Sequence, residues 1–229
     1  MGTVADNVAA VRERIAEAAL RSGRRPEDIR LIAVTKTVSP EVIGQALAAG
    51  ITDVGENRVQ EALGKAPALP AGITWHLIGH LQTNKAKQAV QLFPWVHSLD
   101  SLHLAQALEK RAAATGVRVK CLVEVNVAGE ASKHGVRPEE ALKLLEGVAA
   151  LEHIEVRGLM TVAPYVTDPE EVRPVFRELA ALARQAAELK LPQVTMTELS
   201  MGMSGDFEVA IEEGATMVRI GTAIFGRRS

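Results

Sequence analysis

The sequence predicts a single (β/α)8 barrel of the TIM type over residues 1–229, preceded by one extra N-terminal helix. Short apolar runs alternate with helical segments along the chain, and such alternation indicates parallel strands. It gives eight strand–helix units in 229 residues, close to the roughly 250 residues of a typical barrel. The first strand is followed by residues 36–40, KTVSP, and not by the Gly-x-Gly-x-x-Gly turn of a Rossmann sheet. An open doubly wound sheet is therefore the weaker alternative.

The N-terminal helix is predicted from its apolar spacing. Val4, Val8, Val11 and Ile15 lie four, three and four residues apart, which places them on one helix face. Residues 31–34 are a short apolar run rich in branched side chains, and they predict the first buried strand.

The first barrel helix is predicted over residues 40–49, with Ser39 as candidate N-cap, Pro40 at the first helical position and Gly50 at the stop. The same alternation continues to the end of the chain. The further strands are predicted over residues 53–57, 74–79, 95–99, 117–127, 154–162, 194–199 and 217–220. The helices that follow them are predicted over residues 58–65, 84–92, 101–114, 138–151, 169–190 and 206–213, with the short segment after Ile220 as the last.

Composition and charge exclude several classes of protein. Lys plus Arg number 26 and Asp plus Glu number 28, so the net charge of −2 gives no general basic surface for nucleic acid. A hydrophobic fraction of 47% excludes a disordered chain, and no apolar run approaches the roughly 18 residues of a membrane span. The single cysteine, Cys121, forms neither an internal disulfide nor a cysteine-based zinc site. We expect a cytoplasmic protein without nucleic-acid or membrane partners.

Lys36 is the first candidate for chemistry. In a barrel of this kind, functional residues follow the carboxyl ends of the strands, and Lys36 comes directly after the apolar first strand. Apolar surroundings lower the pKa of a lysine, and the neutral amine attacks an aldehyde to form a Schiff base. A solvated lysine at a strand end is the alternative interpretation.

Two loops near the end of the chain predict an anion site. Residues 200–206, SMGMSGD, hold two glycines and two serines whose backbone N–H groups can converge, and the next helix adds its positive end, with Ser204 as candidate N-cap. In residues 219–222, RIGT, Gly221 permits close backbone approach and Thr222 offers a hydroxyl and an N–H. Barrels often bind phosphate between the loops after strands seven and eight. Two ordinary tight turns are the alternative.

An amine beside a phosphate site points to two chemistries. One is pyridoxal 5'-phosphate (PLP), and the other is a class I aldolase that acts on a sugar phosphate. Arg219 bears on the choice, because it can face the pyridine nitrogen without keeping it protonated, or it can hold the phosphate bidentately. The sequence leaves both roles of Arg219 open.

Five segments resemble the signature segments of the pyridoxal phosphate homeostasis protein family, also described as proline-synthase co-transcribed or alanine racemase-like proteins. The resemblance covers nearly the whole chain, in order and without large gaps. The segments are AVTKT at 33–37, GENRVQE at 55–61, WHLIGHLQTNK at 75–85, ELSMGMSGD at 198–206 and VRIGTAIFG at 218–226.

The resemblance implies a PLP barrel of fold type III, with Lys36 as the Schiff-base lysine and Asn57 lining the cofactor. It also implies a role in intracellular vitamin B6 and amino-acid homeostasis without strong catalytic activity. PLP is the expected cofactor, apo forms of PLP-dependent enzymes are the candidate partners, and Lys36 is the predicted catalytic residue. We expect the cofactor-binding residues to be Lys36, Asn57, His80, Ser200, Met201, Gly202, Ser204, Arg219, Gly221 and Thr222.

A weak PLP-dependent amino-acid racemase is the alternative function. Two-base racemization needs an acid/base group on each face of the substrate carbon. Related racemases have a second, β-rich domain that supplies a tyrosine across a dimer interface, whereas this chain ends at Ser229, after its last barrel unit. Its single tyrosine, Tyr165, is predicted in a loop after the sixth strand. We therefore expect a monomer without efficient catalysis.

His76 and His80 have the spacing of a metal-binding pair, but the sequence predicts no metal. No carboxylate flanks the pair, and zinc sites need three or four ligands. A neutral, hydrogen-bonded histidine near the pocket is the favoured interpretation. Residues 132–135, SKHG, could cover the barrel mouth and resemble a family segment, but a solvated polar loop is favoured there.

Overall fold

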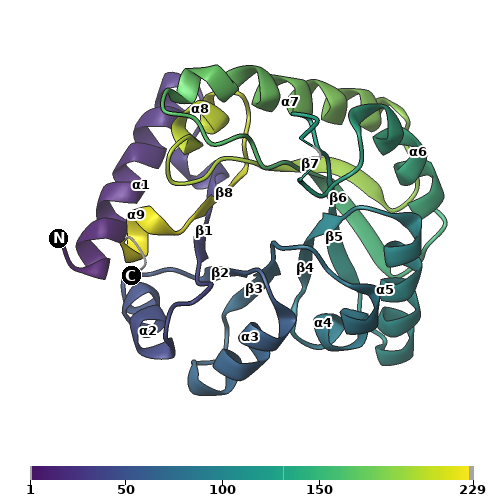
Figure 1. Cartoon of the computed structure of the whole chain (residues 1–229), viewed down its shortest axis with the longest axis horizontal. Coiled ribbons are helices and arrows are strands. Elements are labelled where there is room, and N and C mark those ends of the chain that lie inside the picture. The colour runs from purple at the N-terminus through teal and green to yellow at the C-terminus, as the bar shows by residue number, and fades with distance from the viewer. Residues whose placement is uncertain (1, 131, 227–229) are drawn as a thin grey trace.

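The eight strands close into a parallel barrel, as the alternation predicted, and they follow one another around it in chain order (Figure 1). The computed structural model describes residues 2–130 and 132–226. Closure confirms the barrel and excludes the open sheet, since β1 pairs with β2 on one side and with β8 on the other. The strands are β1 (Arg30–Val34), β2 (Asp53–Glu56), β3 (Thr74–Leu77), β4 (Trp95–Leu99), β5 (Val119–Glu124), β6 (Ile154–Met160), β7 (Val194–Ser200) and β8 (Met217–Ile220).

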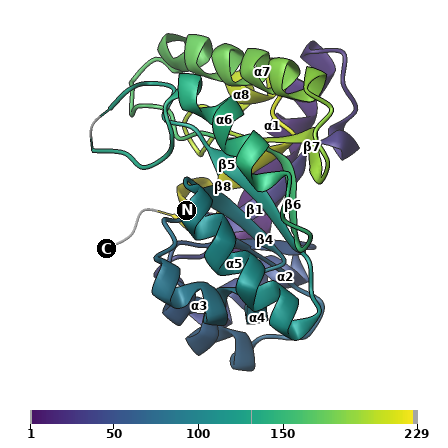
Figure 2. The ribbon, with the colours of Figure 1, turned by 90° about the vertical axis from the view of Figure 1, so that its right-hand side faces the viewer.

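The helices surround the barrel, and two views at right angles place α5 and α6 outside β4, β5 and β6 (Figures 1 and 2). The extra N-terminal helix is α1 (Val4–Arg21). The others are α2 (Pro40–Ala48), α3 (Val59–Lys65), α4 (Ala86–Leu92), α5 (Leu102–Thr115), α6 (Pro138–Val148), α7 (Arg173–Glu188), α8 (Phe207–Glu212) and α9 (Thr222–Phe225). In the part of the chain that the structure describes, no helix is both long and apolar enough to cross a membrane.

Helix α1 begins at a capping box that was not predicted. Thr3 Oγ1 accepts the N–H of Asp6, and the Asp6 carboxylate accepts the N–H of Thr3 in return. The predicted face of α1 is buried, and it packs on α2, α8 and α9. Helix α1 therefore covers the seam where β8 returns to β1.

The barrel interior contains both apolar and polar side chains. Side chains alternate between the two faces of a strand, so every second residue points to the axis. One apolar cluster fills part of the interior and consists of Ile32, Trp95, Leu122, Met160 and Met217. Asp53, His76 and His97 share this interior as a hydrogen-bonded group, and the larger apolar core lies between the strands and the helices.

Most predicted elements extend a few residues beyond the observed ones, and the difference is largest for one strand and one helix. Strand β5 ends at Glu124, because Val125 instead forms a single bridge with Val136 in the following loop. The predicted helix over residues 169–190 begins with a 3-10 turn, Pro169–Val172, before α7 starts at Arg173. Neither difference moves the loops that carry the site.

Candidate functional site

A cavity with a volume of 260 Å³ opens where the loops after β1, β6, β7 and β8 meet, and we call it the lysine cavity. Ligand pockets commonly measure about 300–1,000 Å³, so this cavity suits a small ligand. A larger hollow of 440 Å³ at the other ends of β1 and β2 has no lysine in its lining. The lysine cavity is lined by Val34, Lys36, Pro164, Tyr165, Val166, Met203, Ser204, Gly205, Asp206, Arg219, Gly221 and Thr222.

Lys36 reaches this cavity from the turn after β1. Thr37, the next residue, has a φ of 60°, which is rare for a branched side chain. Its N–H donates to Glu61 Oε1 over 2.5 Å, and Lys65 Nζ donates to the same oxygen and, over 2.7 Å, to the carbonyl oxygen of Thr35. Helix α3 thus holds the residues on both sides of Lys36 and fixes where its side chain leaves the backbone.

Glu56 also stabilises the turn that carries Lys36, through bonds from Thr35 and Lys65. Its Oε1 accepts from Thr35 Oγ1 at 2.7 Å and from Lys65 Nζ at 2.8 Å. Burial raises the pKa of Glu56, although the bonds from Lys65 and Thr35 act in the opposite direction. The carboxylate therefore belongs to the support of Lys36 and does not line the lysine cavity.

The two loops that predicted an anion site face the lysine cavity together. Ala223 N donates to Ser204 Oγ over 3.2 Å, which ties the loop after β7 to the first turn of α9. The N–H of Thr222, the first residue of α9, has no partner within the helix. Backbone and hydroxyl donors from both loops therefore border one cavity.

Ser204 does not cap α8, so that prediction was wrong. Helix α8 begins at Phe207, and Asp206 occupies its N-cap position. Asp206 Oδ1 instead accepts the N–H of Met203 over 2.6 Å and closes the loop on itself. Ser204 is left to bridge to α9.

Arg219 is held inside the barrel. Its side chain is 3% exposed, Nη1 donates to Ser200 Oγ over 2.5 Å, and Nη2 donates to the carbonyl oxygen of Thr161 over 2.8 Å. Burial lowers the pKa of Arg219 to about 10, so the guanidinium is still charged at neutral pH. A fixed positive charge therefore stands in the wall of the lysine cavity.

A chain of hydrogen bonds runs through the barrel from Asp53 to Arg219. Asp53 Oδ1 lies 2.9 Å from His76 Nε2, His76 Nδ1 lies 2.9 Å from His97 Nε2, and His97 Nδ1 lies 2.9 Å from Ser200 Oγ. Although burial acts to raise it, bonds from His76 and Thr52 hold the pKa of Asp53 below its usual value. Burial lowers the pKa of both His76 and His97, so both rings are neutral at neutral pH.

The ionised Asp53 sets the direction of every proton in this chain. A carboxylate only accepts, so His76 donates from Nε2 and must accept at Nδ1. His97 then donates from Nε2 and accepts the hydroxyl proton of Ser200 at Nδ1. The Ser200 oxygen is thereby free to accept from Arg219. Asp53, which lies far from the lysine cavity along this chain, thus fixes the orientation of the group that holds Arg219.

The predicted site residues fall into three places. Lys36, Ser204, Arg219, Gly221 and Thr222 line the lysine cavity. Ser200 and Met201 are fully buried behind its wall. Gly202 lies beside them with a φ of 92°, and an added Cβ would lie 2.6 Å from Ala210 Cβ, so the close approach of this loop to α8 requires glycine.

Asn57 and His80 line a neighbouring cavity of 230 Å³, which we call the histidine cavity. The loop after β5 forms much of its wall, so residues 132–134 do more than contact solvent. Its other lining residues are Ile78, Gly79, Glu124, Val125, Asn126 and Val162.

Glu124 gives the histidine cavity a titrating group. Burial, with a contribution from Asp100, raises the pKa of Glu124 to about 7, and its Oε2 has no hydrogen-bond partner within the described chain. In the unfolded chain its pKa returns to 4.5. Between pH 4.5 and about 7 the folded protein therefore holds a proton on Glu124 that the unfolded chain has lost. The free energy of unfolding falls as the pH rises through this range.

We expect Glu124→Gln to stabilise the protein at pH 8 by on the order of 2 kcal/mol, because it removes a buried charge. The gain should fade toward pH 5, where the parent carboxyl is protonated in the fold. Urea unfolding at several pH values measures this difference. A gain that is independent of pH would contradict the assignment.

The histidine pair of the sequence analysis is divided between two environments. His76 lies inside the barrel against Asp53, and His80 lies beyond β3, with Nδ1 3.2 Å from Asp100 Oδ2. No carboxylate flanks this pair in the sequence, but the fold brings Asp53 to His76 and Asp100 to His80. Asp53, His97 and Asp206 were not predicted as site residues. For Asp53 one signal was available, because residues 53, 55 and 57 alternate along a strand and therefore share one face with the predicted Asn57.

The fold and site define a class of protein. A family model described as alanine racemase, N-terminal domain, matches residues 7–229. An alanine racemase from Clostridium difficile 630 superposes with a TM-score of 0.77 at 16% identity, covering 99% of this chain and 57% of that chain. At this identity the likeness concerns the fold alone. The chain has the barrel of the alanine racemase class.

More similar proteins define the family. A pyridoxal phosphate homeostasis protein of Aquifex aeolicus is 46% identical over 224 residues, which cover 97% of each chain. One from Pseudomonas aeruginosa is 44% identical over 229 residues and covers 100% of this chain and 97% of its own. The structure of PipY from Synechococcus elongatus PCC7942 with PLP bound superposes with a TM-score of 0.83 at 38% identity, covering 97% of this chain and all of that chain. The chain belongs to the pyridoxal phosphate homeostasis protein family.

Proposed function

We propose that this protein binds PLP as a Schiff base on Lys36 and serves vitamin B6 and amino-acid homeostasis without strong catalytic activity. The observation that carries the proposal is one cavity that holds a lysine amine, two donor-rich loops and a buried arginine. Family membership supports it, because a similar protein has been solved with PLP bound.

The residues present fit the chemical groups of PLP. The amine of Lys36 would take the aldehyde, and the donors of Ser204, Gly221 and Thr222 would take the phosphate. When bound, PLP supplies an electron-withdrawing ring that stabilises negative charge on an attached carbon. The turn that α3 holds keeps Lys36 directed at the cavity.

Arg219 can serve the ring or the phosphate, and its contacts favour the ring. Its guanidinium is anchored toward the barrel interior by Ser200 and Thr161, whereas the donor-rich loops border the cavity from outside the strand ends. A charged arginine donates but does not protonate a ring nitrogen, which makes the ring a weaker electron sink. This supports a carrier in preference to an efficient enzyme.

Reduction with borohydride tests the proposal. The purified protein is incubated with PLP, reduced and weighed intact, and the modified peptide is then mapped. We expect one phosphopyridoxyl adduct, on Lys36. A protein that gains no adduct after addition of PLP does not have the proposed function, and trapping of a keto substrate in place of PLP would favour an aldolase.

We expect Arg219→Gln to weaken PLP binding about 10- to 100-fold, because a hydrogen bond from a charged group is worth about 1.5–3 kcal/mol. Equilibrium titration, followed by the absorbance of bound PLP, measures the change. Arg111→Gln, a substitution on an exposed face of α5, is the matched control. Equal affinity for the two variants would contradict a role for Arg219.

Weak racemization is a second candidate, because Tyr165 lines the same cavity as Lys36. The tyrosine is 99% exposed, so no buried contact fixes its hydroxyl for proton transfer. A panel of amino acids, each followed by its loss of optical activity in the presence of PLP, tests this candidate, with Tyr165→Phe as the comparison.

We further propose that the protein is a monomer and passes PLP to apo enzymes. Transfer of PLP to an apo enzyme that is faster than the release of free PLP would support direct transfer.

A further inference from the structure

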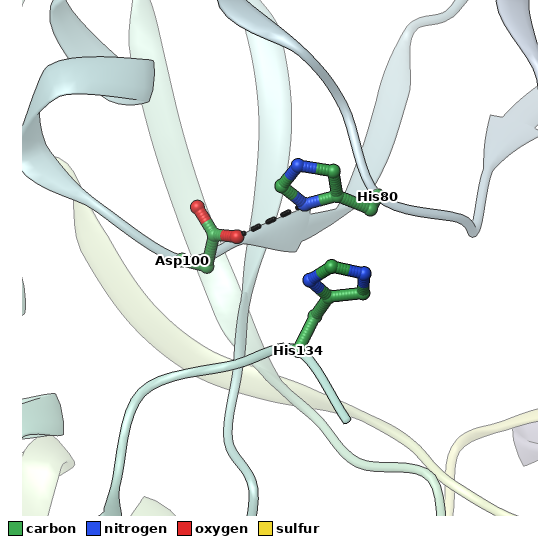
Figure 3. Close-up of side chains that lie close together, drawn as sticks. All are labelled: His80, Asp100 and His134. Atoms are coloured by element: carbon green, nitrogen blue, oxygen red, sulfur yellow. Dashed lines mark ion pairs between the residues drawn. The ribbon is translucent and has the colours of Figure 1, made fainter. Parts of the chain in front are cut away.

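Three potential metal ligands meet at the barrel mouth from three consecutive strands. His80 follows β3, Asp100 follows β4, and His134 lies in the loop after β5. His80 Nδ1 is 3.2 Å from Asp100 Oδ2, and the rings of His80 and His134 are stacked with their centroids 4.1 Å apart and an interplanar angle of 11°. One ligand atom from each residue lies within 4.8 Å of the other two (Figure 3).

The backbone holds each of these residues in place. Ser98 Oγ donates to the carbonyl oxygen of Gly79, over 2.7 Å, which fixes the turn that carries His80. A Cβ at Gly79 would lie 2.5 Å from the carbonyl oxygen of Asn57, so this turn packs as closely as glycine permits. Asp100 directly precedes Ser101, the N-cap of α5.

The loop of His134 is tied to β5 on both sides. Asn126 N donates to the carbonyl oxygen of Val136 over 2.8 Å, and Val136 N donates to that of Glu124 over 2.9 Å. Asn126 Nδ2 donates to the carbonyl oxygen of Glu130 over 2.9 Å. The three side chains therefore meet on anchored backbone and not on free loops.

Unpartnered oxygen atoms line the cavity next to the two rings. Glu124 Oε2 and Asn126 Oδ1 are buried and have no hydrogen-bond partner within the described chain, and both residues line the histidine cavity with His80 and His134. Native structures leave few buried acceptors unpartnered. Asn126 Oδ1, and Glu124 Oε2 when that carboxyl is ionised, are acceptors beside two imidazoles and favour a cationic occupant.

We propose that His80, Asp100 and His134 bind a divalent transition-metal ion, for which zinc is the best match. Two imidazole nitrogens and one carboxylate oxygen are borderline ligands that suit zinc, whereas magnesium prefers oxygen ligands alone. This site differs from the His76–His80 pair, for which the sequence predicted no metal, because His76 is enclosed in the barrel interior. Three protein ligands leave one tetrahedral position for a water or a small-molecule oxygen at the mouth.

Metal binding requires one of the two stacked rings to turn. Zinc binds imidazole nitrogen at about 2.0–2.1 Å, so two ligand atoms in a tetrahedral site lie roughly 3.3 Å apart. The ligand atoms here lie within 4.8 Å of one another. Because imidazole lone pairs lie in the ring plane, a tilt of one stacked ring brings its nitrogen toward the shared centre.

Titration of the full-length protein with Zn²⁺ and with Co²⁺ tests the proposal, after removal of metals by a chelator. We expect one ion per chain, and visible absorption bands of Co²⁺ bound by nitrogen and oxygen ligands. Loss of an outer-sphere partner typically weakens metal binding roughly 10- to 100-fold. We expect at least this loss of metal affinity when a ligand itself is replaced, in His80→Ala, His134→Ala and Asp100→Asn. His103→Ala, an exposed histidine on α5, is the matched control.

The outcomes separate this site from PLP binding and from misfolding. PLP itself can chelate metal, so the titrations are made with and without PLP, and binding that appears only with PLP would overturn the proposal. Circular dichroism and the borohydride adduct on Lys36 verify that each variant is folded and loaded. If the parent shows no saturable ion, or if the three variants bind as the control does, the proposal is wrong. Asp100→Asn, which conserves side-chain shape, keeps the test valid if an alanine variant fails to fold.

Discussion

Lys36→Ala should abolish the reducible PLP adduct completely, because the substitution removes the amine that, among the described residues lining the lysine cavity, can bond covalently to the aldehyde. Among the residues that line this cavity, no other carries a primary amine. The phosphate donors and Arg219 remain, so we expect residual, noncovalent binding of much lower affinity. Intact mass after reduction and the absorbance of bound PLP measure the two effects separately.

The matched control for this experiment is Lys87→Ala, since Lys87 is an exposed lysine on α4. It should keep the adduct at the level of the parent. The stability of the Lys36→Ala variant in urea should stay close to that of the parent, because Lys36 lies in a turn and not in the core. An adduct of unchanged yield in Lys36→Ala would place the Schiff base on another lysine and overturn the proposed site.

His97→Phe should destabilise the protein by about 2–6 kcal/mol, although it conserves an aromatic ring in a fully buried position. The substitution leaves His76 Nδ1 without a donor and the Ser200 hydroxyl proton without an acceptor, and each buried unsatisfied group costs about 1–3 kcal/mol. Ser200 also loses the partner that orients it toward Arg219. We therefore expect weaker PLP binding in addition. Urea unfolding and PLP titration are the measurements.

The pH dependence of stability distinguishes the loss of a buried, neutral histidine in His97→Phe from a simple loss of packing. Burial holds the pKa of His97 well below its ordinary value of 6.5. Below pH 6.5 the unfolded parent therefore takes up a proton that the folded parent does not. The free energy of unfolding of the parent falls as the pH falls. The difference between the parent and His97→Phe should shrink on acidification. His103→Phe, on the exposed face of α5, should change stability by less than about 0.5 kcal/mol at every pH.

Much of the architecture could be predicted because it depends on local patterns. Each predicted strand formed within a few residues of its expected bounds, and the final short segment formed α9. Strand ends and glycine- or serine-rich turns are also local signals. For this reason Lys36, Ser204 and the Gly221–Thr222 turn could be assigned to one end of the barrel, where the structure places them around one cavity.

The positions of Asn57, His80 and Ser200 relative to that cavity could not be predicted in the same way. All three follow or end strands, yet His80 turns toward Asp100, and Ser200 turns inward to His97 and Arg219. The direction of a side chain at a strand end depends on which partners the neighbouring strands present. Those partners are separated by up to 103 residues in the chain, as His97 and Ser200 are.

The sequence alone determined the barrel, the order of its elements and the end of it that carries a lysine beside donor-rich loops. These features follow from periodicity, turn chemistry and chain order, which are properties of neighbouring residues. Only the tertiary structure decided that Asp53 orients Ser200 through two neutral histidines, and that His80, Asp100 and His134 meet in one cluster. The physical reason is that barrel closure brings strands together across large sequence separations, and buried polar groups then pair with whatever donor or acceptor lies within about 3 Å.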